Sequence, residues 1–293
     1  MTRTGLFFLL VSVLAAACDE AGEPALASTS AACALACNGA PELCDRRYDE
    51  VTYPTTHNAM SAAAEGWIHT DQRYGIARQL RDGIRALMLD VHNFGGEPYL
   101  CHGGACATGK RKLVDGLRDI ARFMRQNPDE VVTIIFEPYV DAVQIRDALV
   151  TVGLDRQLHV QDPSQPFPTL RQLITAQHRL VVFTEHGGGA FPWFHDVWQY
   201  AWDTNWEFYA PEEMNCNANR GNVHNPLFIF NNIMVTDDDA EAFAQRINVN
   251  PFLLGRAQEC QEVSGKRANF VTVDYYDVGD LFSVVRTLNG LTP

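Results

Sequence analysis

Short runs of apolar and β-branched residues alternate along the chain with stretches whose apolar residues recur every three or four positions. The runs predict strands at residues 51–53, 84–91, 98–100, 131–136, 180–184, 227–230 and 270–274. The stretches predict helices at residues 72–81, 113–126, 143–152, 240–246 and 281–288. Strand–helix alternation of this length predicts an α/β fold around a parallel sheet, which is either open or closed into a barrel.

The first seventeen residues follow a different pattern. One basic residue, Arg3, precedes an apolar stretch at 6–17 that ends in three alanines before Cys18. This order predicts a signal peptide at residues 1–17. Cys18 directly after small residues resembles a bacterial lipobox, in which the cysteine is diacylated and becomes the mature N-terminus. The alternative is ordinary cleavage, which leaves Cys18 as a plain thiol.

Residues 19–36 are rich in Ala, Ser, Thr and Glu and show little periodicity. They predict a flexible tether, so we divide the chain into a signal peptide (1–17), a lipobox cysteine with its tether (18–36) and one domain (37–293). No apolar run reaches the roughly 18 residues of a membrane span. We expect an exported lipoprotein of the bacterial cell envelope, or a secreted protein if Cys18 is not acylated.

Export makes disulfides the expected state of the cysteines. The chain has eight cysteines. The expected pairs are Cys101 with Cys106, which close a short loop, Cys37 with Cys44, and Cys216 with Cys260. A lipid on Cys18 would then leave Cys33 as the odd thiol.

Composition narrows the classes of partner. Hydrophobic residues make up 46% and charged residues 20% of 293 residues, which is enough for one full-sized core. The formal net charge of −13 argues against nucleic-acid binding and against docking on anionic lipid through a basic face. We expect a monomer that binds no nucleic acid.

Polar residues stand at the ends of five predicted strands. They are His57 and Asn58, Asp90 and His92, His102, Glu137, and Asp274. The carboxyl ends of the strands of a parallel barrel meet on one face, where catalytic residues collect. A single histidine at a strand end is more often a hydrogen-bonded structural residue. Five such strand ends in one chain favour one functional site.

The residue types at these ends suit phosphoryl or acyl transfer. Two histidines with a pKa near 6.5 can divide the acid and base roles, and a carboxylate behind one of them would fix its tautomer. Asn58, Asp90 and Glu137 offer oxygen ligands for a hard cation such as Ca²⁺ or Mg²⁺.

In order along the chain, the motifs resemble the X-domain of phosphatidylinositol-specific phospholipase C. They are residues 49–60 around His57, residues 83–90 ending in Met88-Leu89-Asp90, residues 100–103 with His102, and the strands within 127–137, 178–184 and 269–274. The resemblance covers about residues 37–290. It is greatest to the secreted X-domain-only proteins of plants, fungi and bacteria.

The resemblance implies a distorted TIM-type (β/α) barrel with a PLC-like phosphodiesterase fold. It also implies cleavage of a phosphatidylinositol-type lipid, or a related phosphodiester, to diacylglycerol and inositol phosphate. His57 would serve the attacking hydroxyl, His102 would protonate the leaving oxygen, and Asp274 would orient His57. The N-terminal lipid anchor would hold the protein at the membrane of its substrate.

Calcium-dependent members of the family hold the metal with four ligands. Asn58, Asp90 and Glu137 match three of them, but Met88 stands where the other carboxylate belongs. A thioether is a poor ligand for Ca²⁺, so we expect a weak Ca²⁺ site. Without a cation, positive charge beside the phosphate would come from His92 or from the cluster that begins at Lys110.

Two alternatives remain at this stage. One is a non-catalytic surface lipoprotein that uses the same shell to bind a lipid headgroup or a glycan, and Met88 favours it. The other is an enzyme like the glycerophosphodiester phosphodiesterases. The aromatic residues between 191 and 209 suit either a rim that contacts lipid or sugar, or a small core under a long loop, and we favour the small core.

Overall fold

The computed structural model describes residues 35–235 and 240–292. Cys18, Cys33, the signal peptide and nearly all of the tether lie outside these residues. The described residues belong to one compact unit. Among them, no helix combines the length and the apolar character that crossing a membrane requires.

Eight parallel strands form one curled sheet and follow one another around it in chain order. They are β1 (Tyr53–Thr56), β2 (Ala86–Phe94), β5 (Val132–Tyr139), β6 (Leu180–Thr184), β7 (His195–Asp196), β8 (Ala201–Thr204), β10 (Leu227–Asn232) and β11 (Phe270–Val273). β1 pairs with both β2 and β11, so the first and last strands are neighbours. No ladder between described residues joins β7 to β8. The expected distorted TIM-type barrel is confirmed, and this opening is its distortion.

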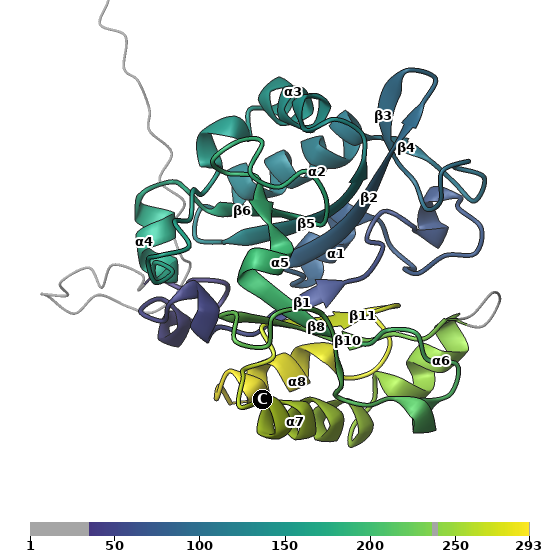
Figure 1. The fold of residues 1–293 in the computed structure, drawn as a ribbon, viewed down its shortest axis with the longest axis vertical. Coiled ribbons are helices and arrows are strands. Elements are labelled where there is room, and N and C mark those ends of the chain that lie inside the picture. Colours follow the sequence, from purple (N-terminus) through teal and green to yellow (C-terminus); the bar gives the residue numbers. More distant parts are fainter. Residues whose placement is uncertain (1–34, 236–239, 293) are drawn as a thin grey trace, which may run out of the picture. The chain divides into compact units, whose positions relative to one another are not determined.

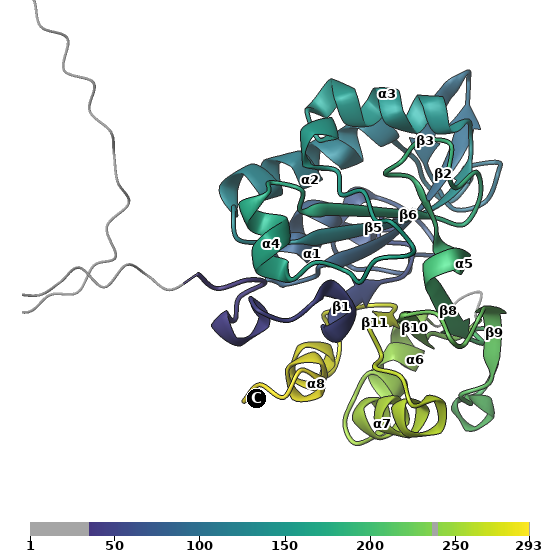
Figure 2. The same cartoon turned by 60° about the vertical axis from the view of Figure 1, so that its left-hand side comes forward.

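Helices cover the outside of the sheet, as Figures 1 and 2 show. They are α1 (Ile76–Asp82), α2 (Leu113–Gln126), α3 (Ala142–Val152), α4 (Leu170–Thr175), α6 (Ala240–Ile247), α7 (Phe252–Ser264) and α8 (Leu281–Leu288). The short α5 (Val197–Tyr200) leads from β7 to β8 across the opening. The antiparallel β3 (Glu97–Leu100) and β4 (Arg111–Lys112) extend from β2, and β9 (Ala218–Gly221) pairs with β8.

Five short 3₁₀ turns complete the described secondary structure. They are Pro41–Leu43, Tyr48–Glu50, Ala63–Glu65, Asp155–Gln157 and Pro211–Glu213.

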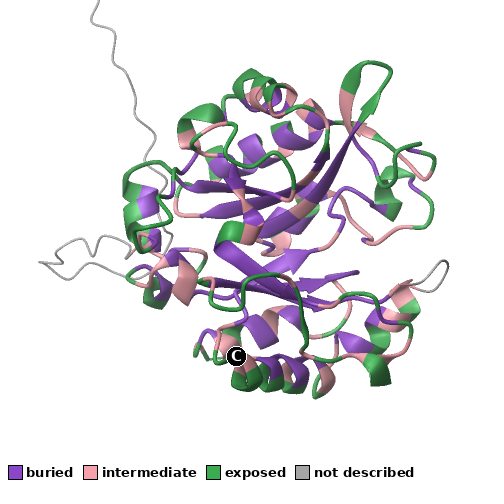
Figure 3. Ribbon diagram, viewed as in Figure 1, coloured by how far each residue is buried: buried purple, intermediate pink, exposed green. Residues whose placement is uncertain are grey.

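The strands of this sheet are buried over most of their length (Figure 3). All five residues of β6 are buried, because both faces of a parallel strand are covered in such a fold. α4 begins at a reciprocal cap, in which the Gln172 N–H donates to Thr169 Oγ1 and the Thr169 N–H donates to the Gln172 side chain. α2 ends ahead of Pro128, whose ring disfavours a helical residue before it.

β1 spans Tyr53–Thr56 rather than the predicted 51–53, because two polar residues are buried in it. The Thr55 hydroxyl donates to the Tyr53 carbonyl oxygen at 3.0 Å, and the Thr56 hydroxyl donates to Gln79 Oε1 at 2.8 Å. Each hydroxyl has an acceptor, so burying it costs little. The apolar pattern alone does not reveal that the strand continues through these two threonines.

The aromatic residues between 191 and 209 are mostly part of the core. Phe194, Trp202 and Phe208 are buried, and Trp202 stacks on Phe228 with ring centroids 4.0 Å apart. Trp206 and Tyr209 are the exceptions, with 38% and 64% of their surface exposed.

His195 in β7 is a buried histidine that serves the fold. Its Nδ1–H donates to the Val182 carbonyl oxygen at 2.8 Å, and its Nε2 accepts from the Gln161 N–H at 3.0 Å. These two partners fix the neutral tautomer. Burial lowers the pKa of His195 to about 4.

We expect the free energy of unfolding to fall by about 2 kcal/mol between pH 7 and pH 5 through His195. An unfolded histidine has a pKa of about 6.5, so acid protonates the unfolded state first. The stabilisation is complete above that pKa and is lost as the pH falls toward the folded value. Urea unfolding at both pH values measures it. His195→Leu should lose most of the pH dependence and exposed His224→Gln should keep it, whereas equal pH dependence in both variants would contradict the assignment.

The three expected disulfides are present. Cys37 is bonded to Cys44, Cys101 to Cys106, and Cys216 to Cys260. The first two close loops of sequence separation 7 and 5, and the third closes a loop of sequence separation 44. The third bond therefore restrains the unfolded chain most.

Replacing Cys216 and Cys260 by serine should lower the free energy of unfolding by about 4 kcal/mol. A disulfide lowers the entropy of the unfolded chain by an amount that grows with the length of the loop it closes. The same change at Cys37 and Cys44 should therefore lower the free energy of unfolding by only about 2.5 kcal/mol, because that loop is much shorter. Urea unfolding without reductant measures both. A larger loss for the short loop would contradict the entropic account.

Candidate active site

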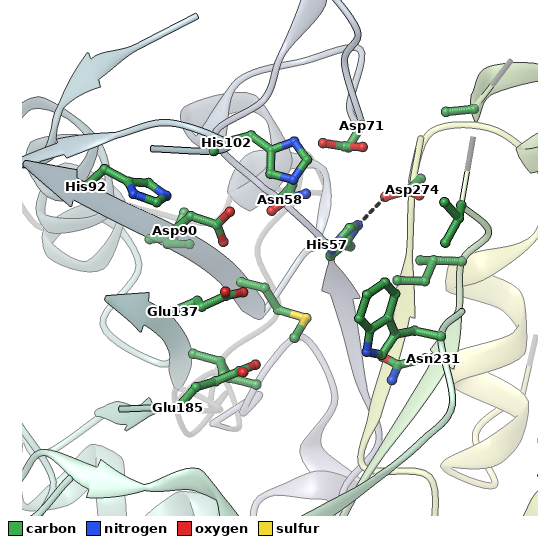
Figure 4. A pocket seen from close by; sticks show the side chains of 18 of the residues that line it. His57, Asn58, Asp71, Asp90, His92, His102, Glu137, Glu185, Asn231 and Asp274 are labelled. Atoms are coloured by element: carbon green, nitrogen blue, oxygen red, sulfur yellow. Dashed lines mark hydrogen bonds and ion pairs between the residues drawn. The ribbon is translucent and has the colours of Figure 1, made fainter. Parts of the chain in front are cut away.

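A cavity of about 630 Å³ opens at the carboxyl-terminal side of the parallel strands (Figure 4). All seven residues expected from the strand ends line it, namely His57, Asn58, Asp90, His92, His102, Glu137 and Asp274. Met88 lines it as well. The barrel thus brings together side chains that lie more than 200 positions apart in the sequence.

His57 and Asp274 form a hydrogen-bonded pair at the ends of the neighbouring strands β1 and β11. His57 Nδ1 lies 2.9 Å from Asp274 Oδ1. Burial by itself would lower the pKa of His57, because it disfavours the charged imidazole. The negative charges of Asp274 and, to a smaller extent, of Asp71 and Asp90 outweigh this effect and raise the pKa of His57 to about 9. A raised pKa makes the imidazole a stronger proton acceptor.

Gln72 holds the backbones of this pair together. Its Nε2 donates to the carbonyl oxygens of His57 at 2.7 Å and Val273 at 3.1 Å, and its Oε1 accepts from the Tyr276 N–H at 3.2 Å. Gln72 is fully buried, so these contacts are shielded from water. The separation of the two strand ends is therefore fixed.

The turn after His57 is fixed by Asn58 and its neighbour. Asn58 has a φ of +41°, in the left-handed region that asparagine tolerates better than most residues. The next residue, Ala59, donates its N–H to the Met88 carbonyl oxygen at 2.9 Å. This bond ties the turn to β2, the strand that carries Asp90.

His102 reaches the cavity from the loop that the Cys101–Cys106 disulfide closes. The residue itself is exposed. The surrounding protein and the nearby charge of His57 lower the pKa of His102. The surroundings thus move the two pKa values in opposite directions, upward at His57 and downward at His102.

Asp90 and Glu137 are register partners on β2 and β5 and point into the cavity (Figure 4). Only 7% of Asp90 is exposed, and its carboxylate forms no hydrogen bond with a described residue. Burial and the charge of Glu137 raise its pKa to about 8. A buried carboxylate of this kind is stabilised by a proton or by a cation. With Asn58, the donor set is all hard oxygen, so these residues fit Ca²⁺ or Mg²⁺.

Asp71 is a further acidic residue of the cavity, and the sequence analysis did not single it out. One ligand atom each from His57, Asp71 and Asp274 lie within 4.8 Å of one another. Asp71 Oδ2 is buried and has no hydrogen-bond partner among described atoms. Burial and the charge of Asp274 raise the pKa of Asp71 to about 7. His57 thus faces two carboxylates.

Of the two residues expected to bind the phosphate, His92 lies in the cavity and Lys110 does not. His92 lines the cavity and stacks on Tyr139, with ring centroids 4.3 Å apart. Burial lowers the pKa of His92, which makes it a weak source of positive charge. Lys110 is not among the lining residues, and its Nζ lies 4.4 Å from the centroid of the Phe94 ring.

Glu185, Arg220 and Asn231 also line the cavity, and the sequence analysis missed them. Trp206, one of the aromatic residues between 191 and 209, lines it as well. Glu185 and Asn231 occupy strand ends like those that were found, on β6 and β10. Arg220 lies on β9, where no pattern marks it. Burial raises the pKa of Glu185 to about 7 despite the opposing charge of Arg220.

Comparison with known proteins identifies the family. The family model for the PI-PLC X domain matches residues 43–289. The chain belongs to the PI-PLC X domain family. The chain is 27% identical over 269 residues to a PI-PLC X domain-containing protein of Arabidopsis thaliana. The alignment covers 83% of this chain and 62% of that protein.

Two fungal relatives belong to Arthroderma benhamiae. An uncharacterized secreted protein is 27% identical over 291 residues, covering 87% of this chain and 64% of that protein. The PI-PLC X domain-containing protein 1 is 26% identical over 277 residues, covering 88% and 90%. The chain thus spans less than two thirds of the Arabidopsis protein and of the secreted fungal protein.

Solved structures with this fold include bacterial phosphatidylinositol-specific phospholipases C. One from Staphylococcus aureus superposes with a TM-score of 0.60 at 13% identity, covering 85% of this chain and 95% of that one. One from Listeria monocytogenes superposes with a TM-score of 0.57 at 13% identity, covering 84% and 94%. At these identities the similarity establishes the barrel fold of the PI-PLC X domain described here.

Proposed function

We propose that this protein is a phosphodiesterase of the phospholipase C class. Its substrate is a phosphatidylinositol-type lipid or a related phosphodiester, and its products are diacylglycerol and an inositol phosphate. The observation that carries the proposal is a pair of histidines, His57 and His102, facing one cavity, with Asp274 bonded to the first of them. Membership of the PI-PLC X domain family supports it.

The geometry supports distinct roles for the two histidines. Asp274 accepts from His57 Nδ1–H, which leaves Nε2 as the atom that takes the proton of an attacking hydroxyl once the ring is neutral. His102, on the loop at the cavity, protonates the oxygen of the leaving diacylglycerol. Each transfer by a positioned side chain contributes about 10²–10⁴-fold to the rate.

Asn58, Asp90 and Glu137 would hold a hard divalent cation, with Ca²⁺ as the first choice. Such an ion supplies positive charge beside the phosphate. In its absence Asp90, whose pKa burial raises to about 8, would be protonated near neutral pH, and none of the three residues would offer positive charge to the phosphate. Met88 adds no charged ligand, so the site we propose is weak.

The proposed location is outside the cytoplasm. Three disulfides and the secreted fungal relative support export. We infer a monomer that is held at the membrane by lipid on Cys18. Mass spectrometry of the mature N-terminus tests the anchor, and an unmodified N-terminus would remove it.

A non-catalytic protein that binds a lipid headgroup or a glycan is the second candidate, because Met88 occupies the place of a metal ligand. A panel of phospholipids and glycerophosphodiesters, assayed with and without EDTA, separates the candidates. Release of diacylglycerol from phosphatidylinositol supports the proposal. Glycerol phosphate from deacylated diesters indicates a glycerophosphodiesterase, and binding without any product indicates the non-catalytic protein.

A further inference from the structure

Asp274 stands at the point where the chain leaves β11 through a strained turn. The next residue, Tyr275, has a φ of +45°, in the left-handed region that a bulky side chain rarely adopts. A residue held there costs about 1–3 kcal/mol and persists only where its surroundings fix it. The direction of the Asp274 side chain, and with it the bond to His57, therefore depends on the contacts that hold this turn.

One side of the turn is held by the segment that precedes α1. The Tyr275 N–H donates to the Asp71 carbonyl oxygen at 2.7 Å, and the Tyr275 hydroxyl donates to the Thr70 carbonyl oxygen at 2.8 Å. Both contacts fix Tyr275, and neither involves the carbonyl group of Asp274. The orientation of that peptide group is therefore set from elsewhere.

The other side of the turn is held by Asn248, the first residue after α6. Its Nδ2 donates to the Asp274 carbonyl oxygen at 2.7 Å. Asn248 has no exposed surface and Asp274 only 8%, so water does not compete for this bond. Asn248 lies 26 positions before Asp274 and is not among the residues that line the cavity of about 630 Å³.

Asn248 is a rigid donor, because its other polar groups have partners of their own. Its N–H donates to the Ala244 carbonyl oxygen at 2.9 Å, and its carbonyl oxygen accepts from the Asp280 N–H at 2.7 Å. Its Oδ1 accepts from Asn232 Nδ2 at 3.1 Å, and Asn232 Oδ1 accepts from the buried Arg256 guanidinium at 3.3 Å. The amide of Asn248 cannot rotate without breaking this network.

Asn289 shows what a purely structural amide of the same kind does. It is 3% exposed, and its side chain accepts from the Thr52 N–H at 2.9 Å and donates to the Thr52 carbonyl oxygen at 2.8 Å. Thr52 precedes β1, at the end of that strand away from His57, and neither Thr52 nor Asn289 lines the cavity. Asn248 differs in that its acceptor belongs to the residue whose carboxylate is bonded to His57.

We propose that Asn248 is a positioning residue of the active site. By holding the Asp274 carbonyl group against the strain at Tyr275, it sets the direction of the Asp274 carboxylate toward His57. Because Asn248 does not line the cavity, it acts on turnover rather than on the binding of substrate. Its effect on kcat rests on the proposed function, whereas its effect on the bond between His57 and Asp274 does not.

NMR of the His57 ring tests the proposal without relying on turnover. In protein labelled with ¹⁵N-histidine, both ring nitrogens are read through the carbon-bound protons, and the signals of His57 are assigned by their loss in His57→Ala. Asp274→Asn shows where the Nδ1 signal lies without the carboxylate. At the same pH, we expect Asn248→Leu to move the Nδ1 signal toward that position, because leucine has a similar volume and donates no hydrogen bond.

The same variant should lower kcat by about 10–10²-fold with a nearly unchanged KM, since a displacement of about 1 Å in a catalytic group costs up to about 10²-fold. Initial rates of diacylglycerol release measure this. If Asn248→Leu fails to fold, Asn248→Ser carries the same expectation for both measurements, because its hydroxyl is one atom shorter than the amide.

Asn289→Leu is the matched control. It also removes the two hydrogen bonds of a buried amide, so it should lower Tm as Asn248→Leu does. It should leave the His57 signals and kcat unchanged. An unmoved Nδ1 signal in a folded Asn248 variant, or an equal movement in Asn289→Leu, would overturn the proposal.

Turnover separates the positioning role from the proposed enzyme. A moved Nδ1 signal in Asn248→Leu, with no hydrolysis of any lipid by the unmodified protein, would keep the positioning of Asp274 and remove the enzymatic function. Hydrolysis with an unchanged kcat in folded Asn248→Leu would keep the enzyme and remove the positioning role. A moved signal together with a lowered kcat and a nearly unchanged KM supports both.

Discussion

Replacing His57 or His102 by alanine should lower kcat by about 10²–10⁴-fold while the barrel remains folded. Each change removes one of the two proton transfers that we propose. Asp274→Asn should also lower kcat, because an amide does not stabilise the imidazolium that forms on His57. Initial rates of diacylglycerol release measure these effects.

The matched control is His224→Ala, at an exposed histidine that does not line the cavity. It should retain the activity of the unmodified protein. Circular dichroism and thermal unfolding establish that each variant is folded. Full activity of either folded catalytic-histidine variant, on every substrate tried, would remove the mechanism.

Chelation of divalent cations should have the next largest effect. We expect EDTA to abolish turnover and about millimolar Ca²⁺ to restore it, because extracellular calcium modules operate at about 10⁻⁴–10⁻³ M. Met88→Glu should tighten Ca²⁺ binding, since affinity follows the number and charge of oxygen ligands. Isothermal titration calorimetry with Ca²⁺ alone measures this without relying on turnover.

Met88→Gln is the matched control, because it adds an oxygen of similar reach without a charge. It should tighten binding less than Met88→Glu does. Calorimetry that finds no heat of binding at millimolar Ca²⁺, together with turnover that resists EDTA, would contradict the metal site. His92, which lines the cavity, would then be the first of the expected sources of positive charge to examine.

Local signals were sufficient for much of the fold. β6 coincides with the strand predicted at 180–184, because its uninterrupted apolar run is bounded by polar residues. α2 coincides with the helix predicted at 113–126, because its amphipathic pattern also ends at polar residues on both sides. α7 was missed because its buried side includes Arg256. That guanidinium donates to the Asn231 carbonyl oxygen at 2.8 Å and lies 4.5 Å from the centroid of the Phe230 ring. A charged residue satisfied in this way breaks the apolar period.

The candidate site was predictable wherever its residues follow strands. Glu137 was found at the end of β5, and the same rule applied to β6 would have found Glu185. Asp71 and Arg220 carry no such signal, because one lies in a loop and the other on a short edge strand. Their positions depend on long-range partners, such as Asp203 for Arg220, which a single sequence does not reveal.

The short disulfide at the cavity has a consequence for where the protein can act. His102 lies within the covalent ring that Cys101 and Cys106 close, and both cysteines are buried while the loop between them is exposed. In a reducing cytosol the ring would be open, and the imidazole would lie on a longer loop that is held only at its ends by the pairing of β3 with β4. A newly made chain would therefore hold the second histidine of the proposed acid–base pair in a closed ring only after oxidation outside that compartment.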